Sequence, residues 1–158
     1  MLACVVANVF ADSPMGSPKK VTVCSTSGEY CAVSDPGTGE TTLKRRGEAS
    51  PLWTVPGWYS WLLVTDDGNR IIIGYPGLNL IPKDMGMDAD VFRIYGPTGL
   101  VKSIALGDLY QSKDQLSETE SHYAWEKAVY IDMKGHLVVE REDSQMKTFD
   151  PSTGVLIK

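Results

Sequence analysis

Residues 132–157 read DMKGHLVVEREDSQMKTFDPSTGVLI, and this stretch combines two kinds of turn with runs of strand-forming residues. It opens on the turn motif Asp132-Met133-Lys134-Gly135 and closes on Asp150-Pro151-Ser152-Thr153-Gly154. Asp, Ser or Thr at the first position of a turn and Gly at the fourth are typical of a type I turn closed by a residue with positive φ. The stretch therefore predicts antiparallel hairpins.

Both turn motifs occur twice more, earlier in the chain. The first recurs as Ser25-Thr26-Ser27-Gly28 and as Thr65-Asp66-Asp67-Gly68. The second recurs as Thr38-Gly39 and Thr98-Gly99, each preceded by a proline, which presets φ and cannot donate to a β-ladder. A turn pattern that recurs along the chain indicates a fold built from repeated structural units, although no single residue identifies a chemical activity.

Short runs rich in β-branched and aromatic residues flank these turns and are expected to form strands. The opening strands are expected at 21–24, 61–64 and 129–131, the return strands at 29–34, 69–75 and 136–141, and further strands at 40–45, 100–106 and 155–157. We predict an all-β fold of antiparallel hairpin repeats near 21–45, 61–106 and 129–157. Residues 106–125 lack β-branched runs and predict a short helical insertion, with Ser117 and Glu120 spaced as in a capping box.

The stretch from Asp132 to Ile157 resembles a blade of the WD-type and related β-propeller repeats, and a looser likeness covers most of residues 21–158. The first repeat is short and is expected to lack a hairpin, whereas the second carries an insertion near 76–90. Propellers usually close with four or more blades. Three units leave open a β-sandwich, an incomplete propeller-like sheet assembly, or several chains that associate as a homo-oligomer.

The charge of the chain and its N-terminal residues give information on its partners and on its cellular compartment. The net charge of −5, without a long basic run, argues against a nucleic-acid partner. Residues 1–11 are apolar and end on Val9-Phe10-Ala11, which resembles the end of an export signal that lacks its basic part; the alternative is a buried first strand. The stretch is too short to cross a membrane. We expect one domain over residues 12–158, in the periplasm or secreted.

Two cysteines flank the first turn motif. If the turn is centred on Ser27-Gly28, Cys24 and Cys31 lie directly opposite each other, at a separation that suits a disulfide. An exported protein would retain such a bridge, and the alternative is a pair of reduced thiols.

Motifs of catalysis and cofactor binding are missing from the sequence, and no cofactor is predicted. His122 lies between carboxylates and is a candidate ligand-binding residue, or it docks the helical turn. Asp84, Asp88 and Asp90 form an acidic loop that is a candidate calcium site, or a Cu(I) site with its methionines; the alternative is a solvated surface loop.

Aromatic residues gather between positions 53 and 61. Trp53, Trp58, Tyr59 and Trp61 are candidate ligand-binding residues, and Trp125 is a further one. Exposed Trp and Tyr rings stack on sugars or anchor protein partners, whereas buried rings would serve the core. We expect an exported, non-catalytic module that binds a protein or a glycan. The alternatives are a hydrolase or metal-dependent enzyme built on His122 and the acidic loop, and a self-assembling structural repeat.

Overall fold

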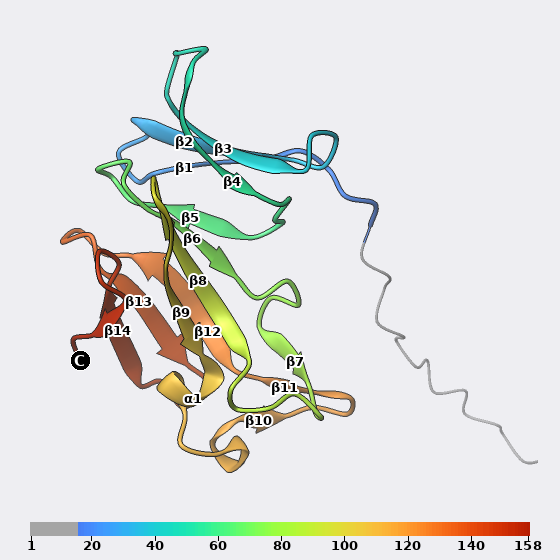
Figure 1. Ribbon diagram of the computed structural model, residues 1–158. Coiled ribbons are helices and arrows are strands. Elements are labelled where there is room, and N and C mark those ends of the chain that lie inside the picture. The colour runs from blue at the N-terminus through green and yellow to red at the C-terminus, as the bar shows by residue number, and fades with distance from the viewer. Residues whose placement is uncertain (1–15) are drawn as a thin grey trace, which may run out of the picture.

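The computed structural model describes residues 16–158, which form four antiparallel sheets (Figure 1). The first sheet contains β1 (Val21–Cys24), β2 (Tyr30–Asp35), β3 (Glu40–Arg45) and β4 (Pro51–Pro56). The second contains β5 (Leu62–Val64), β6 (Ile71–Gly74), β8 (Asp90–Gly96) and β9 (Gly99–Ala105). The third contains β12 (Glu126–Ile131), β13 (Leu137–Arg141), β14 (Met146–Asp150) and β15 (Val155–Leu156). A small sheet pairs β10 (Ser117–Glu118), β11 (His122–Ala124) and β7 (Leu80–Pro82).

The predicted all-β class with one short helical insertion is confirmed. In each four-stranded sheet, neighbouring strands follow one another along the chain, apart from the detour through β7. This arrangement is compatible with blade-like units. The helical part consists of α1 (Leu106–Leu109) and a 3-10 turn, η1 (Lys113–Gln115).

The first sheet is larger than the expected repeat at 21–45, because β4 adds a fourth strand that the turn pattern did not predict. The Thr38-Gly39 turn joins β2 to β3, whereas Thr98-Gly99 joins β8 to β9 and therefore lies one turn later in its sheet. β4 begins and ends on proline, which strands tolerate at sheet edges, and among the described strands it pairs with β3 alone. The first unit is thus a complete four-stranded meander, and the expectation that this repeat lacks a hairpin is wrong.

The expected capping box at Ser117 and Glu120 is wrong. Ser117 begins β10, and the chain returns through β11, which pairs with β7. Because that partner strand lies about forty residues earlier, local spacing could not reveal it. The predicted insertion near 76–90 and the predicted helical segment thus meet in one small sheet.

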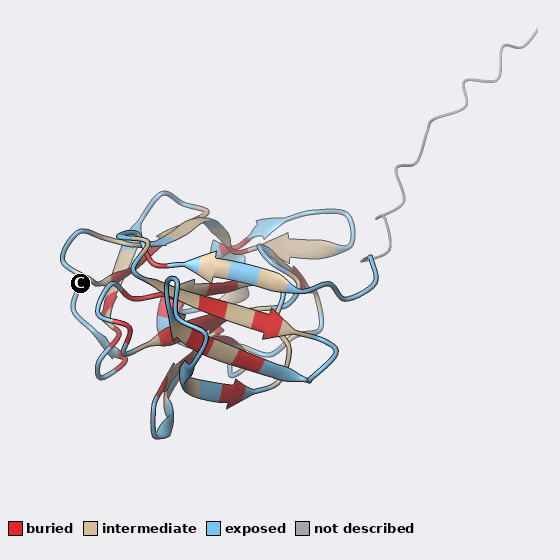
Figure 2. Cartoon of the chain, turned by 90° about the horizontal axis from the view of Figure 1, so that it is seen from above, coloured by how far each residue is buried: buried red, intermediate tan, exposed pale blue. Residues whose placement is uncertain are grey.

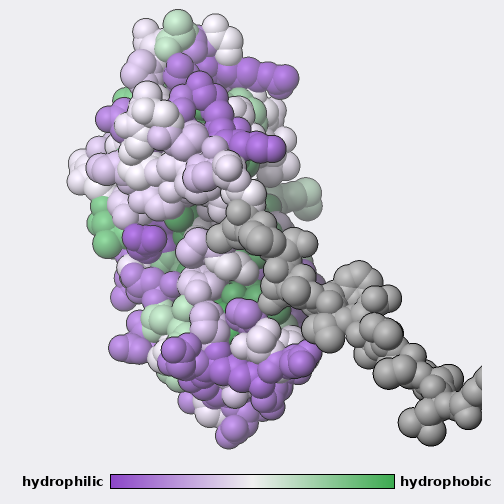
Figure 3. Space-filling view, turned by 90° about the vertical axis from the view of Figure 1, so that its right-hand side faces the viewer, coloured by the Kyte–Doolittle hydropathy of each residue, from purple (hydrophilic) through white to green (hydrophobic). Residues whose placement is uncertain are grey.

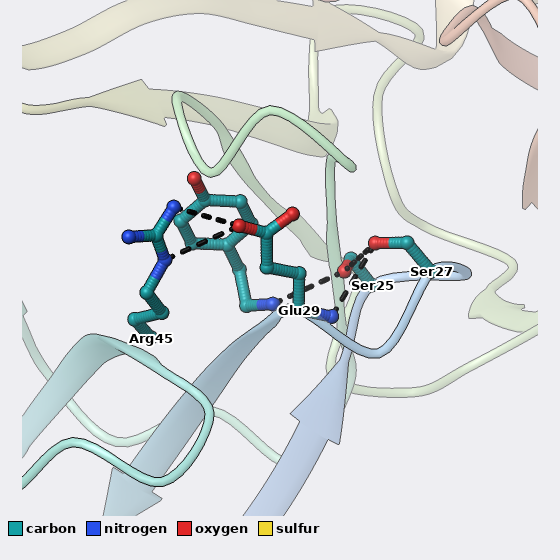
Figure 4. Close-up of polar contacts among 5 residues, drawn as sticks. Ser25, Ser27, Glu29 and Arg45 are labelled. Carbon is teal, nitrogen blue, oxygen red and sulfur yellow. Dashed lines mark hydrogen bonds and ion pairs between the residues drawn. The ribbon is translucent and has the colours of Figure 1, made fainter.

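The turn glycines have the expected backbone conformation. Gly28, Gly68 and Gly135 adopt φ values of 74°, 66° and 82°. In the first turn the Ser25 hydroxyl accepts the Tyr30 N–H at 3.3 Å, and Arg45 donates to the Glu29 carboxylate at 2.7 Å (Figure 4). Side chains of the turn and of the neighbouring strand β3 therefore hold the hairpin end together.

Replacing these glycines by alanine tests the turn conformation. We expect Gly135→Ala to lower the free energy of unfolding by about 1 kcal/mol, because an added Cβ meets nothing within 4 Å and only the positive φ opposes it. Gly68→Ala should cost more, since its Cβ would lie 2.5 Å from the Tyr30 ring. Urea denaturation measures both, with Gly16→Ala as the control. Native stability in Gly68→Ala and Gly135→Ala alike would contradict the turn assignment.

The predicted disulfide is confirmed. Cys24 and Cys31 are register partners on β1 and β2, and their Cα atoms lie 3.9 Å apart across the bridge. The next pair, Ser25 and Tyr30, is linked by a backbone hydrogen bond of 2.8 Å, so the cysteines occupy the narrower, non-hydrogen-bonded position. The bridge closes the first hairpin beside its turn.

The second sheet is the middle layer of the three large sheets (Figure 1). Every residue of β6 is buried, because its side chains reach into both cores. Ile71 and Ile73 pack with Leu43 and Val55 of the first sheet, whereas Ile72 belongs to the larger core shared with the third sheet. Figure 2 shows buried positions concentrated along the strands and exposed positions in the connections between them. Burial on both faces explains the unbroken apolar run of β6.

Candidate ligand-binding site

Three of the predicted binding residues lie together in the loop that joins β4 to β5. Trp58, Tyr59 and Trp61 are half-buried and line a cavity of about 200 Å³ with Ser60, Gly74, Pro76 and Arg93. The loop is not a strand, so the alternation expected between Trp58 and Trp61 does not apply. Figure 3 looks onto the side of the molecule where the long connections lie, and hydrophobic surface emerges there between hydrophilic zones.

Hydrogen bonds hold two of these rings in place. The Trp58 indole N–H donates to the carbonyl oxygen of Lys19 at 2.8 Å, and the Tyr59 hydroxyl donates to the carbonyl oxygen of Pro56 at 2.8 Å. The Tyr59 backbone N–H donates to the buried hydroxyl of Ser34 at 2.7 Å. Because the polar atoms of these two side chains bond within the protein, the rings contribute mainly apolar surface to the cavity.

Arg93 is a residue of this cavity that the sequence reasoning missed. It lies on β8, opposite Ile73, and its guanidinium is 5.9 Å from the centre of the Tyr59 ring. Burial raises the pKa of Tyr59, followed by the effect of Tyr95, so the phenol is neutral at physiological pH. The sequence could not identify Arg93 as a cavity residue, because its position beside Tyr59 depends on how the strands pair in the sheet.

Trp61 separates this cavity from a smaller one. Its ring packs against Phe92, with centroids 5.8 Å apart and planes at 44°, and it lies so close to Gly74 that an added Cβ would be 1.8 Å from the indole. Beyond Trp61, the smaller cavity of about 10 Å³ is lined by Trp61, Gly74, Tyr75, Leu78, Phe92, Trp125, Glu126 and Val129. Gly74 therefore provides the space in which the Trp61 ring sits between the two cavities.

Trp125 belongs to the core and contacts the smaller cavity. Only 1% of it is exposed, its ring centre lies 5.4 Å from that of Phe92, and its indole N–H donates to the carbonyl oxygen of Leu78 at 2.9 Å. The ring therefore fixes the loop that carries Leu78 while it forms part of the cavity wall.

Trp53 and His122 lie elsewhere. Trp53 is on β4, where its indole N–H donates to the carbonyl oxygen of Gly68 at 3.1 Å beside the short turns. His122 is on β11, with its Nδ1 atom 2.8 Å from the Ser121 hydroxyl and its backbone N–H bonded to the Thr119 hydroxyl. Neither residue lines the two cavities beside Trp61.

The acidic loop is spread out. Asp84 and Asp88 are exposed, and Asp90 accepts a hydrogen bond of 2.9 Å from the Ser103 hydroxyl. Within residues 16–158, no three His, Cys, Asp or Glu side chains come together as metal ligands. The calcium and copper hypotheses therefore gain no geometric support from the described residues.

A polar cavity of about 750 Å³ lies at the opposite end of the sheets, among the short turns. Among its charged groups, Arg70 donates to the carbonyl oxygens of Pro151 and Ser152, at 3.1 and 3.2 Å. The Ser27 backbone N–H lowers the pKa of Asp66, and a hydrogen bond from the Ser152 side chain lowers that of Asp150. The Asp66 and Arg70 contacts join the turns of neighbouring sheets to one another.

Comparison with known proteins gives no family for the chain. No family model matches it, and neither does any curated protein. Among solved structures, hydrazine synthase of Kuenenia stuttgartiensis aligns with a TM-score of 0.43 and 13% identity, over 87% of this chain and 35% of that one. The chain thus spans about a third of the length of that structure.

The candidate ligand-binding site consists of the two cavities beside Trp61. Aromatic surface lies between a guanidinium on one side and an acidic residue on the other, on the half of the molecule that carries the long connections.

Within residues 16–158, no helix has the length and apolar character needed to cross a membrane.

Proposed function

We propose that this protein is an exported, non-catalytic binding module and that its ligand is a segment of another protein, held across Trp58, Tyr59 and Trp61. The observation that carries the proposal is the shared cavity of these three aromatic side chains with Arg93. Aromatic and arginine side chains are enriched at the energetic centres of protein interfaces. The disulfide in the first hairpin favours an oxidising compartment.

The balance of polar and apolar groups favours a peptide over a glycan. A sugar presents many hydroxyl groups that need partners, whereas the polar atoms of Trp58 and Tyr59 already bond within the protein. A cavity of about 200 Å³ is smaller than the roughly 300–1,000 Å³ typical of whole small-molecule ligands. Its size suits one apolar or acidic side chain of a longer segment that continues over the surface.

The experiment selects peptides from a displayed random library and compares their affinity for the native protein and for Trp58→Ala. We expect the variant to bind at least tenfold more weakly, because a central aromatic contact contributes about 2 kcal/mol or more. The matched control is Tyr130→Ala, which removes an aromatic side chain that is 41% exposed on the third sheet. Equal binding by native protein and Trp58→Ala would contradict the proposal, as would selection of glycans but no peptides from parallel arrays.

A further inference from the structure

The smaller cavity beside Trp61 has aromatic walls on several sides. Trp61, Tyr75, Phe92 and Trp125 all line it. The Trp61 and Phe92 planes meet at 44° and the Phe92 and Trp125 planes at 61°, so the rings form angled walls instead of a parallel stack. Aromatic faces attract a cation that lies within about 6 Å of the ring centre, and the attraction grows when water is excluded. The walls therefore suit a positively charged group.

Glu126 supplies an acidic residue at the same cavity. Burial raises the pKa of its carboxyl group, and the nearby Glu142 raises it further. Within residues 16–158 the Glu126 side chain makes no hydrogen bond or ion pair, although it is half-buried. Partial loss of solvent around a carboxylate without a protein partner is unfavourable, and a cation beside it would relieve that cost.

Leu78 forms the outer part of the wall under backbone strain. Its φ is 58°, which is unusual for a residue that is not glycine, and its carbonyl oxygen is held by the Trp125 indole. Its side chain is 52% exposed. Strained backbone that the surroundings hold in place is concentrated at ligand sites. An exposed apolar side chain at the wall would contact the alkyl chain behind a charged group.

The size of the cavity selects among cations. About 10 Å³ is close to the space that one water molecule needs, and a primary ammonium group has similar dimensions. A quaternary trimethylammonium group is larger. We propose that this cavity binds a primary ammonium group, and that in the bound complex a lysine side chain of the protein partner supplies it. The inference rests on the proposed function, because the lysine would belong to the segment bound across Trp58 and Tyr59.

The test titrates the native chain with n-butylammonium chloride, tetramethylammonium chloride and n-butanol at constant ionic strength, and follows tryptophan fluorescence. We expect butylammonium to change the emission of Trp61 and Trp125 at millimolar concentrations and to bind at least tenfold more tightly than the other two probes. Glu126→Gln should weaken butylammonium binding by about tenfold or more, because the charge-assisted hydrogen bond to the carboxylate becomes a weaker one to a neutral amide. The matched control is Glu140→Gln, a half-buried glutamate on β13 that does not line the cavity.

Tyr75→Leu provides a second test if Glu126→Gln does not fold, because it removes one aromatic wall at a half-buried position. It should weaken butylammonium binding several-fold. Undiminished binding by the folded variants, or an equal response to n-butanol, would overturn the ammonium assignment. A parallel titration with glucosamine hydrochloride tests the amino-sugar alternative. Binding of protonated glucosamine without binding of butylammonium would assign the cavity to an amino sugar and overturn the lysine assignment.

The outcomes separate this inference from the proposed function. If library peptides bind through Trp58 with no preference for lysine and Glu126→Gln leaves their affinity unchanged, the inference fails and the proposed function stands. If butylammonium binds through Glu126 but no peptide does, the cavity assignment stands and the proposed protein partner is wrong.

Discussion

Replacing Trp125 by alanine is expected to lower the free energy of unfolding by about 3–5 kcal/mol, because it empties a site in the middle of the larger core. Trp125 is only 1% exposed, packs edge-on against Phe92, and donates the hydrogen bond that holds the carbonyl group of Leu78. Alanine would leave a cavity and an unpaired carbonyl oxygen. Urea denaturation followed by circular dichroism measures the change.

The control is Trp58→Ala, which removes the same kind of side chain from the loop between β4 and β5. Trp58 is half-buried, and its indole N–H makes one hydrogen bond, to the carbonyl oxygen of Lys19. We expect it to lower stability by less than about 1.5 kcal/mol, the net value of one hydrogen bond, while weakening ligand binding. Equal loss of stability in the two variants would contradict the distinction between a core tryptophan and a binding tryptophan.

The second large effect concerns the disulfide. Replacing both Cys24 and Cys31 by serine should lower the free energy of unfolding by about 2.5 kcal/mol, the value that chain entropy gives for a closed loop of about eight residues. The bridge lies at the end of the first hairpin. There it reduces the number of conformations that the unfolded chain can adopt, and it fixes the register of β1 on β2. Urea denaturation with and without a reductant measures the effect.

The double serine variant is its own control, since a reductant should not change its stability further. In the native protein, non-reducing mass spectrometry should find the peptides that contain Cys24 and Cys31 linked to each other. Free thiols at both positions, or an unchanged denaturation midpoint after reduction, would show that the bridge does not stabilise the fold.

The features that the sequence predicted correctly depend on neighbours along the chain. Gly28, Gly68 and Gly135 adopt positive φ because a few residues determine the type of each turn. The facing positions of Cys24 and Cys31 follow from that turn. By contrast, β4 and the small sheet of β7, β10 and β11 were missed, because proline-bounded edges and distant partners leave little local pattern.

The predicted export segment, residues 1–11, lies outside the described residues.

The candidate binding residues also divide into features that the local sequence shows and features that depend on distant parts of the chain. Their aromatic character is visible in the sequence, but the sequence alone did not distinguish the core residue Trp125 from the loop residue Trp58.

Tertiary structure alone placed Arg93 beside Tyr59 and Glu126 at the cavity behind Trp61. The sequence determined the turns, the first hairpin with its disulfide, and the all-β class, because each depends on backbone preferences and contacts within a few residues. The packing of three sheets decided which aromatic side chains are buried and which charged groups they meet. Those neighbours come from strands tens of residues apart, and burial depends on all of them together.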